Sequence, residues 1–200
     1  MYVVRFALFS SFFYALNVSM IPLIYTFEIS VFLFLFLRFC TAFITSLIAT
    51  KSFFSFASIK KQKLTNLLLG LSFLFGIQSW LYVEAVKYMS VGLASVVLFT
   101  YPLITYLIIS IKKKKAIDLL TIIMFLVAIL GIAAISQSSD GFYTMVMGII
   151  LALLSALTYA LILITTPKVS ELKNWEIVKY TTLIPALTFL CLFIKDTGLQ

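Results

Sequence analysis

Seven apolar runs, each about twenty residues long, constrain this chain to a fold in which helices cross a lipid bilayer. A helix rises about 1.5 Å per residue, so about 20 residues span a hydrocarbon core of about 30 Å. The runs lack the alternation of apolar and polar residues that a barrel of strands would need. The predicted spans are Phe6–Phe27, Ile29–Thr50, Leu64–Val83, Val91–Ile111, Ile117–Ile135, Phe142–Thr166 and Ile177–Ile194.

The composition excludes a water-soluble domain. The chain is 63% hydrophobic and only 11% charged, with a mean hydropathy of +1.16, whereas a soluble domain is about half apolar and a quarter charged. The expected fold class is therefore an all-α polytopic membrane protein, and the first expected partner is the lipid bilayer. The net charge of +8 is explained by lysines in short connections, so no nucleic-acid partner is predicted.

These basic residues also predict the orientation of the chain. Twelve of the 15 Lys and Arg residues lie before the first span or in the connections after the second, fourth and sixth spans. The other connections hold Glu28, then Glu84 with Lys87, and then Asp140. By the positive-inside rule, the N-terminus and the Lys-rich connections are cytoplasmic. The predicted localisation is a bacterial cytoplasmic (inner) membrane, and this assignment counts Lys179 as part of a connection.

The first and sixth spans match one another in sequence. At a constant offset of 145 residues, Ala7–Pro22 and Ala152–Pro167 are identical at seven of sixteen positions, including Tyr14/Tyr159. A five-helix unit that repeats must enter the membrane from the other side the second time, which predicts an inverted repeat. The predicted organisation is a first repeat over residues 1–136 and a partial second repeat of two helices over residues 142–200. A second copy of equal length would extend past residue 200, so a truncated or split product is expected.

One longer stretch resembles a known family. Residues 82–108 contain an Ala-x-Lys-Tyr turn, a Gly-Leu-Ala-Ser sequence and a mid-helix proline, Pro102. Together with the Leu-Arg-Phe sequence around Arg38 and with Gly148, they resemble the EamA family of the drug/metabolite transporter (DMT) superfamily. The resemblance implies two five-helix repeats and transport of a small molecule. The chain departs from the family pattern after the fourth span, where IKKKKAID replaces Gly-Glu-Arg.

Arg38 is the leading candidate for contact with a substrate. It lies nine residues from Ile29, or about 14 Å into a core about 30 Å thick, where a charge is costly unless it faces protein or water. Facing a transport pathway, it would attract a carboxylate or phosphate. The alternative is a structural arginine that pairs with a carbonyl or snorkels towards the surface.

The other pathway candidates are uncharged. Glu84 and Lys87 are predicted to form an ion pair at the outer mouth of the pathway. Interhelical hydrogen bonding without a transport role is equally compatible with the uncharged candidates. Trp80 and Tyr82 are expected in the interfacial aromatic belt. Small residues every four positions from Gly148 predict close packing of another helix, and Pro102 predicts a kink. The pathway candidates besides Arg38 are Tyr14, Asn17, Gln78, Tyr101, Pro102 and Tyr159.

The residues argue against an enzyme or a channel. The chain has no histidine, which removes His-ligated metals and serine–histidine catalysis. The three aspartates lie at helix ends or in connections, and neither a selectivity filter nor a ring of charge is visible in the sequence. No catalytic residue, metal site or cofactor is therefore predicted.

The predicted function is a permease that moves a small-molecule substrate by alternating access, with its site near the midplane between the repeats. Two alternatives stay open: a truncated or split transporter product without activity of its own, and a structural membrane protein that transports nothing. If the chain is a truncated or split product, a homodimer partner or a second chain would complete the second repeat.

Overall fold

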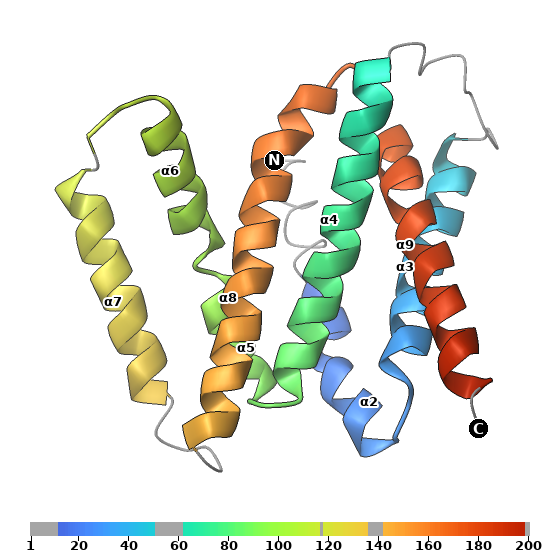
Figure 1. Cartoon of the computed structure of the whole chain (residues 1–200), viewed down its shortest axis with the longest axis horizontal. Helices are drawn as coiled ribbons and strands as arrows, with labels where there is room; N and C mark the ends of the chain where they lie inside the picture. The colour runs from blue at the N-terminus through green and yellow to red at the C-terminus, as the bar shows by residue number, and fades with distance from the viewer. Residues whose placement is uncertain (1–11, 51–61, 117, 136–141, 199–200) are drawn as a thin grey trace.

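The computed structural model describes residues 12–50, 62–116, 118–135 and 142–198, which form helices and no strand (Figure 1). Five helical stretches are long and apolar enough to cross a membrane: Val31–Thr50, Gln62–Val86, Val91–Lys112, Met145–Val169 and Asn174–Thr197. The chain is therefore an all-α, multi-pass membrane protein, as its sequence predicts. The elements are α2 (Ile21–Thr26), α3 (Val31–Thr50), α4 (Gln62–Val86), α5 (Val91–Leu98), α6 (Tyr101–Lys112), α7 (Leu119–Ile135), α8 (Phe142–Thr165), the 3-10 helix η3 (Thr166–Val169) and α9 (Asn174–Thr197).

The two remaining predicted spans are also helical over the residues that the structure describes. Phe12–Thr26, which ends in α2, is a shorter apolar helix, and it is called the first segment below. The predicted start of this span, Phe6, lies outside the described residues. Helix α7 has 17 residues, and its described side chains are largely exposed, as expected for a helix surrounded by lipid.

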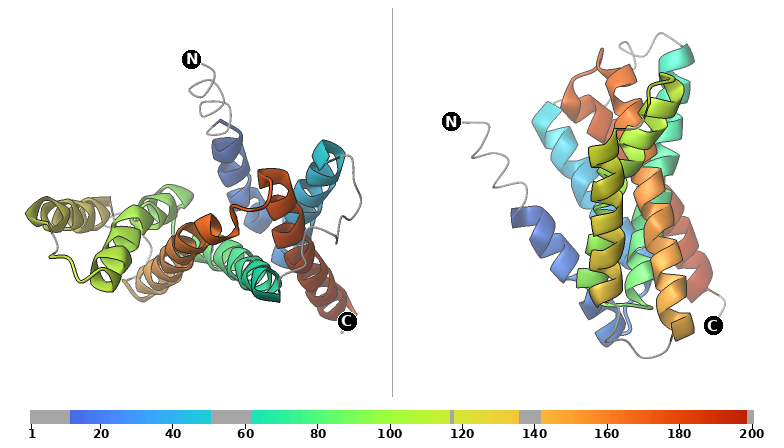
Figure 2. Two further views of the ribbon diagram at one scale, coloured as in Figure 1. Left: turned by 90° about the horizontal axis from the view of Figure 1, so that it is seen from above. Right: turned by 90° about the vertical axis from the view of Figure 1, so that its left-hand side faces the viewer.

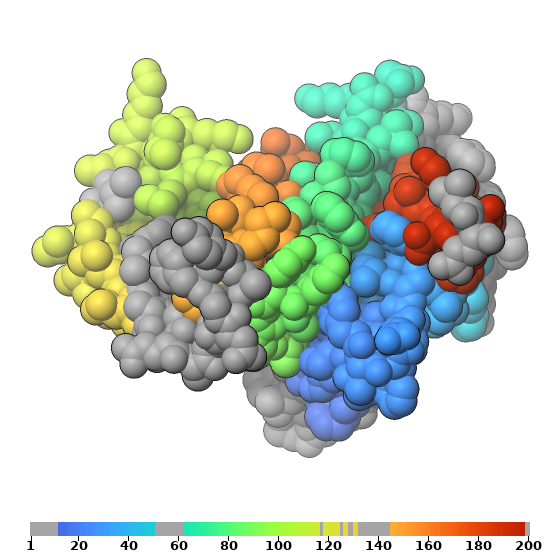
Figure 3. All heavy atoms as spheres, turned by 60° about the horizontal axis from the view of Figure 1, so that its bottom comes forward, coloured from blue at the N-terminus to red at the C-terminus, as the bar shows by residue number. Residues whose placement is uncertain are grey.

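The helices form a bent row when viewed along their axes, with the first segment on one side of it (Figure 2). Helix α4 is central and packs against α8 on one side and α9 on the other. Helix α9 lies between α3 and α4, which touch each other only slightly. Helix α7 stands at one edge of the molecule, and α3 and α9 stand at the opposite edge (Figure 3).

A ridge of small residues joins α8 to α4, as the sequence predicts. Ala152, Ala156 and Ala160 are completely buried. A Cβ atom on Gly148 would lie 2.7 Å from Met89 Cε and 3.3 Å from the carbonyl oxygen of Ala85. The absence of larger side chains along this ridge lets the two backbones approach closely.

The fourth predicted span is broken into two helices. Helix α5 ends at Leu98 and α6 begins at Tyr101, with Pro102 in its first turn. Proline has no N–H to donate to the preceding turn and is tolerated at the start of a helix, so the chain restarts there. The predicted kink is thus a break between two helical pieces, across which the N–H groups of Phe99 and Thr100 still donate to the carbonyls of Ser95 and Val97.

Lysines gather at one end of the bundle, near the start of α4, the end of α6 and the turn before α9 (Figure 1). The assignment of Lys179 to a connection is wrong, because it lies within α9 and is only 1% exposed. The backbone N–H of Lys173 donates to Glu176 Oε2 at 3.3 Å, which caps the helix before the apolar run begins. The Lys179 ammonium lies 5.3 Å from the centre of the Tyr180 ring.

Candidate functional site

A polar cavity of about 250 Å³ lies where five helical elements meet, and it is called the central cavity below. The first segment, α3, α4, α8 and α9 all contribute to its wall. Arginine, amide, hydroxyl and aromatic side chains face it together, which is the mixture expected of a binding site. The lining residues are Tyr14, Val18, Arg38, Phe39, Ala42, Phe75, Gln78, Ser79, Tyr82, Tyr159 and Thr182.

Two tyrosines that match at the sequence offset of 145 residues face this cavity from different helices. Tyr14 comes from the first segment and Tyr159 from α8. Neither hydroxyl has a hydrogen-bond partner in the described parts of the chain. The ring of Tyr159 also meets the ring of Tyr101 edge to face, with centroids 4.6 Å apart. The structure therefore brings the first segment and α8 to one site.

Arg38 provides the positive charge of the cavity wall. It lies seven residues into α3, or about 10 Å along the helix axis. No carboxylate pairs with it and no hydrogen bond leaves its side chain within the described ranges. Tyr14 and Tyr82 line the same cavity. The structure thus places the guanidinium at the cavity and, within the described ranges, shows no hydrogen bond from it to a backbone carbonyl.

Gln78 lines the central cavity and also bonds Ser155 on the neighbouring helix α8. Its Nε2 donates to Ser155 Oγ at 3.2 Å, and Ser155 Oγ donates to the Gln78 carbonyl oxygen at 3.0 Å. Ser79 Oγ donates to Gln78 Oε1 at 3.4 Å. These bonds fix the amide between α4 and α8, and Ser155 itself is completely buried.

We expect Ser155→Ala to lower the free energy of unfolding by about 1 kcal/mol, because it leaves the buried Gln78 amide without its partner. The measurement is unfolding of the purified chain in mixed detergent micelles. Thr158→Val on the same helix is the control, since Thr158 Oγ1 donates only to carbonyls of its own helix, Leu154 and Ser155. Equal losses in the two variants would show that the hydrogen bonds between Gln78 and Ser155 contribute nothing to stability.

The remaining pathway candidates are not among the residues that line the cavity. Tyr101 contacts Tyr159, and Pro102 lies one residue further on, at the start of α6. Asn17 is not a lining residue, and its Oδ1 is buried without a hydrogen-bond partner. Glu84 and Lys87 form the expected ion pair, with 3.8 Å between Lys87 Nζ and Glu84 Oε1, at the end of α4.

Sequence reasoning missed several residues of the wall. Tyr82 was expected in the interfacial belt, which is wrong: it is 3% exposed and its hydroxyl lies 2.7 Å from Ser95 Oγ. Helix α4 continues to Val86, so Tyr82 lies a full turn inside its end. Thr182 also faces the cavity, and no sequence pattern marks it. Val18, Phe39, Ala42, Phe75 and Ser79 complete the missed set.

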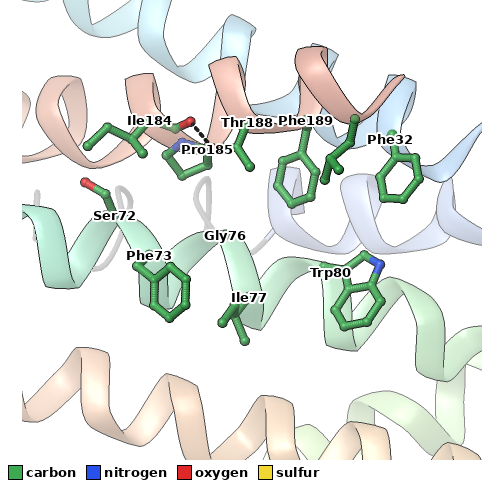
Figure 4. Close-up of a pocket in the computed structure, with 11 residues that line it drawn as sticks. Phe32, Ser72, Phe73, Gly76, Ile77, Trp80, Ile184, Pro185, Thr188 and Phe189 are labelled. Carbon is green, nitrogen blue, oxygen red and sulfur yellow. Dashed lines mark hydrogen bonds between the residues drawn. The ribbon is translucent and has the colours of Figure 1, made fainter. Parts of the chain in front are cut away.

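A second hollow, the α4–α9 groove, is apolar (Figure 4). Its volume is about 340 Å³, and its lining contains no charged side chain. Its two hydroxyls are bonded to backbone carbonyls: Ser72 to Leu68 at 2.7 Å and Thr188 to Ile184 at 2.9 Å. Without polar groups that converge on a ligand, this groove is a poorer candidate than the central cavity.

Comparison with known proteins gives one match. The EamA-like transporter family matches residues 1–137, which include the first segment, α3 and α4. No curated protein and no solved structure matches the chain.

Proposed function

Because the chain belongs to the EamA-like transporter family, we propose that it carries a small metabolite through a cytoplasmic membrane by alternating access, with the central cavity as its binding site. The observation that carries this proposal is the meeting of Tyr14 and Tyr159 at that cavity. Transport sites form at repeat interfaces, and these tyrosines occupy equivalent positions of the two repeats. A volume of about 250 Å³ falls below the roughly 300–1,000 Å³ of pockets for drug-sized ligands, which favours a small substrate.

The break between α5 and α6 supports a moving part beside the site. Tyr101 begins α6 and contacts Tyr159 of the cavity wall. A helix in two pieces can change its bend without breaking a continuous run of hydrogen bonds. In this proposal residues 1–136 and 142–200 rock against each other around the cavity, the Lys-rich end is cytoplasmic, and Glu84 and Lys87 lie at the outer mouth.

The proposal makes no use of a proton relay. The acidic residues that the structure describes lie at or near helix ends, or in the connections. A relay would need a carboxylate within the spans. Facilitated diffusion or exchange therefore fits the described residues better.

The test is uptake into liposomes that contain the purified chain. We expect uptake of at least one compound from a screen of radiolabelled carboxylates, amino acids and nucleosides. Ala42→Trp places an indole ring in the central cavity and should reduce this uptake at least tenfold. Leu120→Trp is the matched control, because Leu120 lies on α7 and is 56% exposed. Uptake that survives Ala42→Trp would exclude the central cavity as the route.

A further inference from the structure

The polar groups of the central cavity divide into those with a protein partner and those without. Gln78 and Ser79 bond each other, and Gln78 also bonds Ser155. The hydroxyls of Tyr82 and Thr182 bond Ser95 and the Val178 carbonyl, at 2.7 and 2.8 Å. Within the described ranges, this leaves the Arg38 guanidinium and the hydroxyls of Tyr14 and Tyr159 without a partner.

All three of these groups can donate hydrogen bonds, and the arginine cannot accept one. The cavity therefore has donors in excess and needs a ligand that brings acceptors. A carboxylate supplies two acceptor oxygens and a negative charge, and a guanidinium can bind both oxygens at once. Charge-assisted bonds of this kind are about twice as strong as neutral ones.

The charge of the wall sets the charge of the ligand. Arg38 is the one charged residue among the lining side chains that the structure describes, and no carboxylate lies among them. An α-ammonium group would therefore find no acidic partner there and would be repelled by the guanidinium. A dianionic phosphate would keep one charge without a cationic partner in the wall. A single negative charge is the best match.

The apolar and aromatic residues of the wall determine which uncharged part of a ligand can fit beside its carboxylate. Phe39 and Phe75 face the cavity together with the rings of three tyrosines. Val18 and Ala42 add aliphatic surface. Such a wall favours a flat or apolar body, because rings stack on one another and apolar surface is removed from water.

We infer that the central cavity selects small monocarboxylates with an aromatic or other apolar body, over zwitterionic amino acids and phosphates. This inference rests on the proposed function, because it takes the cavity to be the transport site. Its binding step is measured without transport, so the two can fail separately.

The experiment is calorimetric titration of the purified chain in lipid nanodiscs with ligands that share one phenyl ring. The probes are 3-phenylpropionate, phenylalanine (the same skeleton with an α-ammonium), 3-phenylpropan-1-ol and phenyl phosphate. We expect 3-phenylpropionate to bind at least tenfold more tightly than each of the others. Arg38→Gln should reduce this preference to within twofold, whereas Lys63→Gln, an exposed residue in the first turn of α4, should preserve it.

Several results would overturn the inference. Tighter or equal binding of phenylalanine would mean that the cavity holds an ammonium group, and tighter or equal binding of phenyl phosphate would mean that it takes dianions. A preference unchanged in Arg38→Gln would place the carboxylate elsewhere. Uptake of other compounds without any binding of 3-phenylpropionate would reject the substrate class and leave the transport function standing. Binding without uptake would reject the transport function and leave the ligand class standing.

Discussion

Arg38→Gln is expected to reduce the initial rate of uptake roughly 10- to 150-fold, measured with the best substrate of the liposome screen. The variant keeps a side chain that can donate hydrogen bonds but removes the positive charge. Hydrogen bonds to a charged group contribute about 1.5–3 kcal/mol, and each 1.36 kcal/mol is about a tenfold change. Because Arg38 has no ionic partner within the described ranges, its removal should leave no carboxylate stranded and should not unfold the chain.

The fold of Arg38→Gln can be checked by its melting temperature in detergent, which should stay within a few degrees of the unchanged protein. Arg38→Lys is a second variant, which keeps the charge but loses the paired donors and should retain part of the uptake. If Arg38→Gln transports at the original rate, Arg38 lies outside the substrate path and its role is in packing alone.

The largest effect on stability is expected from Gly148→Leu. At this position even a Cβ atom would lie 3.1 Å from Tyr88 Cβ and 3.3 Å from the carbonyl oxygen of Ala85. The Met89 side chain can move aside, but the Ala85 backbone cannot move without shifting the end of α4. Overpacking of this kind costs about 1–3 kcal/mol, and we expect a value near 3 kcal/mol. The measurement is the free energy of unfolding in mixed micelles.

Gly70→Leu is the matched control for this substitution. Gly70 also lies within a helix, but a Cβ atom there would meet nothing within 4 Å. The added leucine should therefore leave stability unchanged or raise it by up to about 1 kcal/mol through helix propensity. If both leucines have the same effect, the close approach of α8 to α4 does not contribute to stability.

The arrangement of spans could be predicted from the sequence because lipid imposes a simple rule on length and polarity. The ridge from Gly148 could be predicted for a similar reason, since small residues every four positions form one face of a helix. The helix ends were harder, because polar residues can extend a helix past its apolar run. Lys173 and Glu176 do so at α9, which is why Lys179 lies inside a helix.

The candidate site could be predicted only where a residue was unusual for its surroundings. Arg38 is a charge within a span, and Tyr14 and Tyr159 repeat at one offset. Thr182 and Phe39 are ordinary residues in apolar helices, and they meet at the cavity because α9 packs along α3. That contact joins segments that are far apart in the sequence, so no local sequence pattern predicts it.

The position of α9 between α3 and α4 has a consequence for synthesis of the protein. Helix α3 ends at Thr50 and α9 begins at Asn174, so the ribosome adds more than a hundred residues between them. At roughly 5–20 residues per second, this takes roughly 6 to 25 seconds. During that interval the side of α3 that α9 later covers lacks its main packing partner. Helix α9, which is made well after α3 and α4, adds Thr182 to the wall of the cavity.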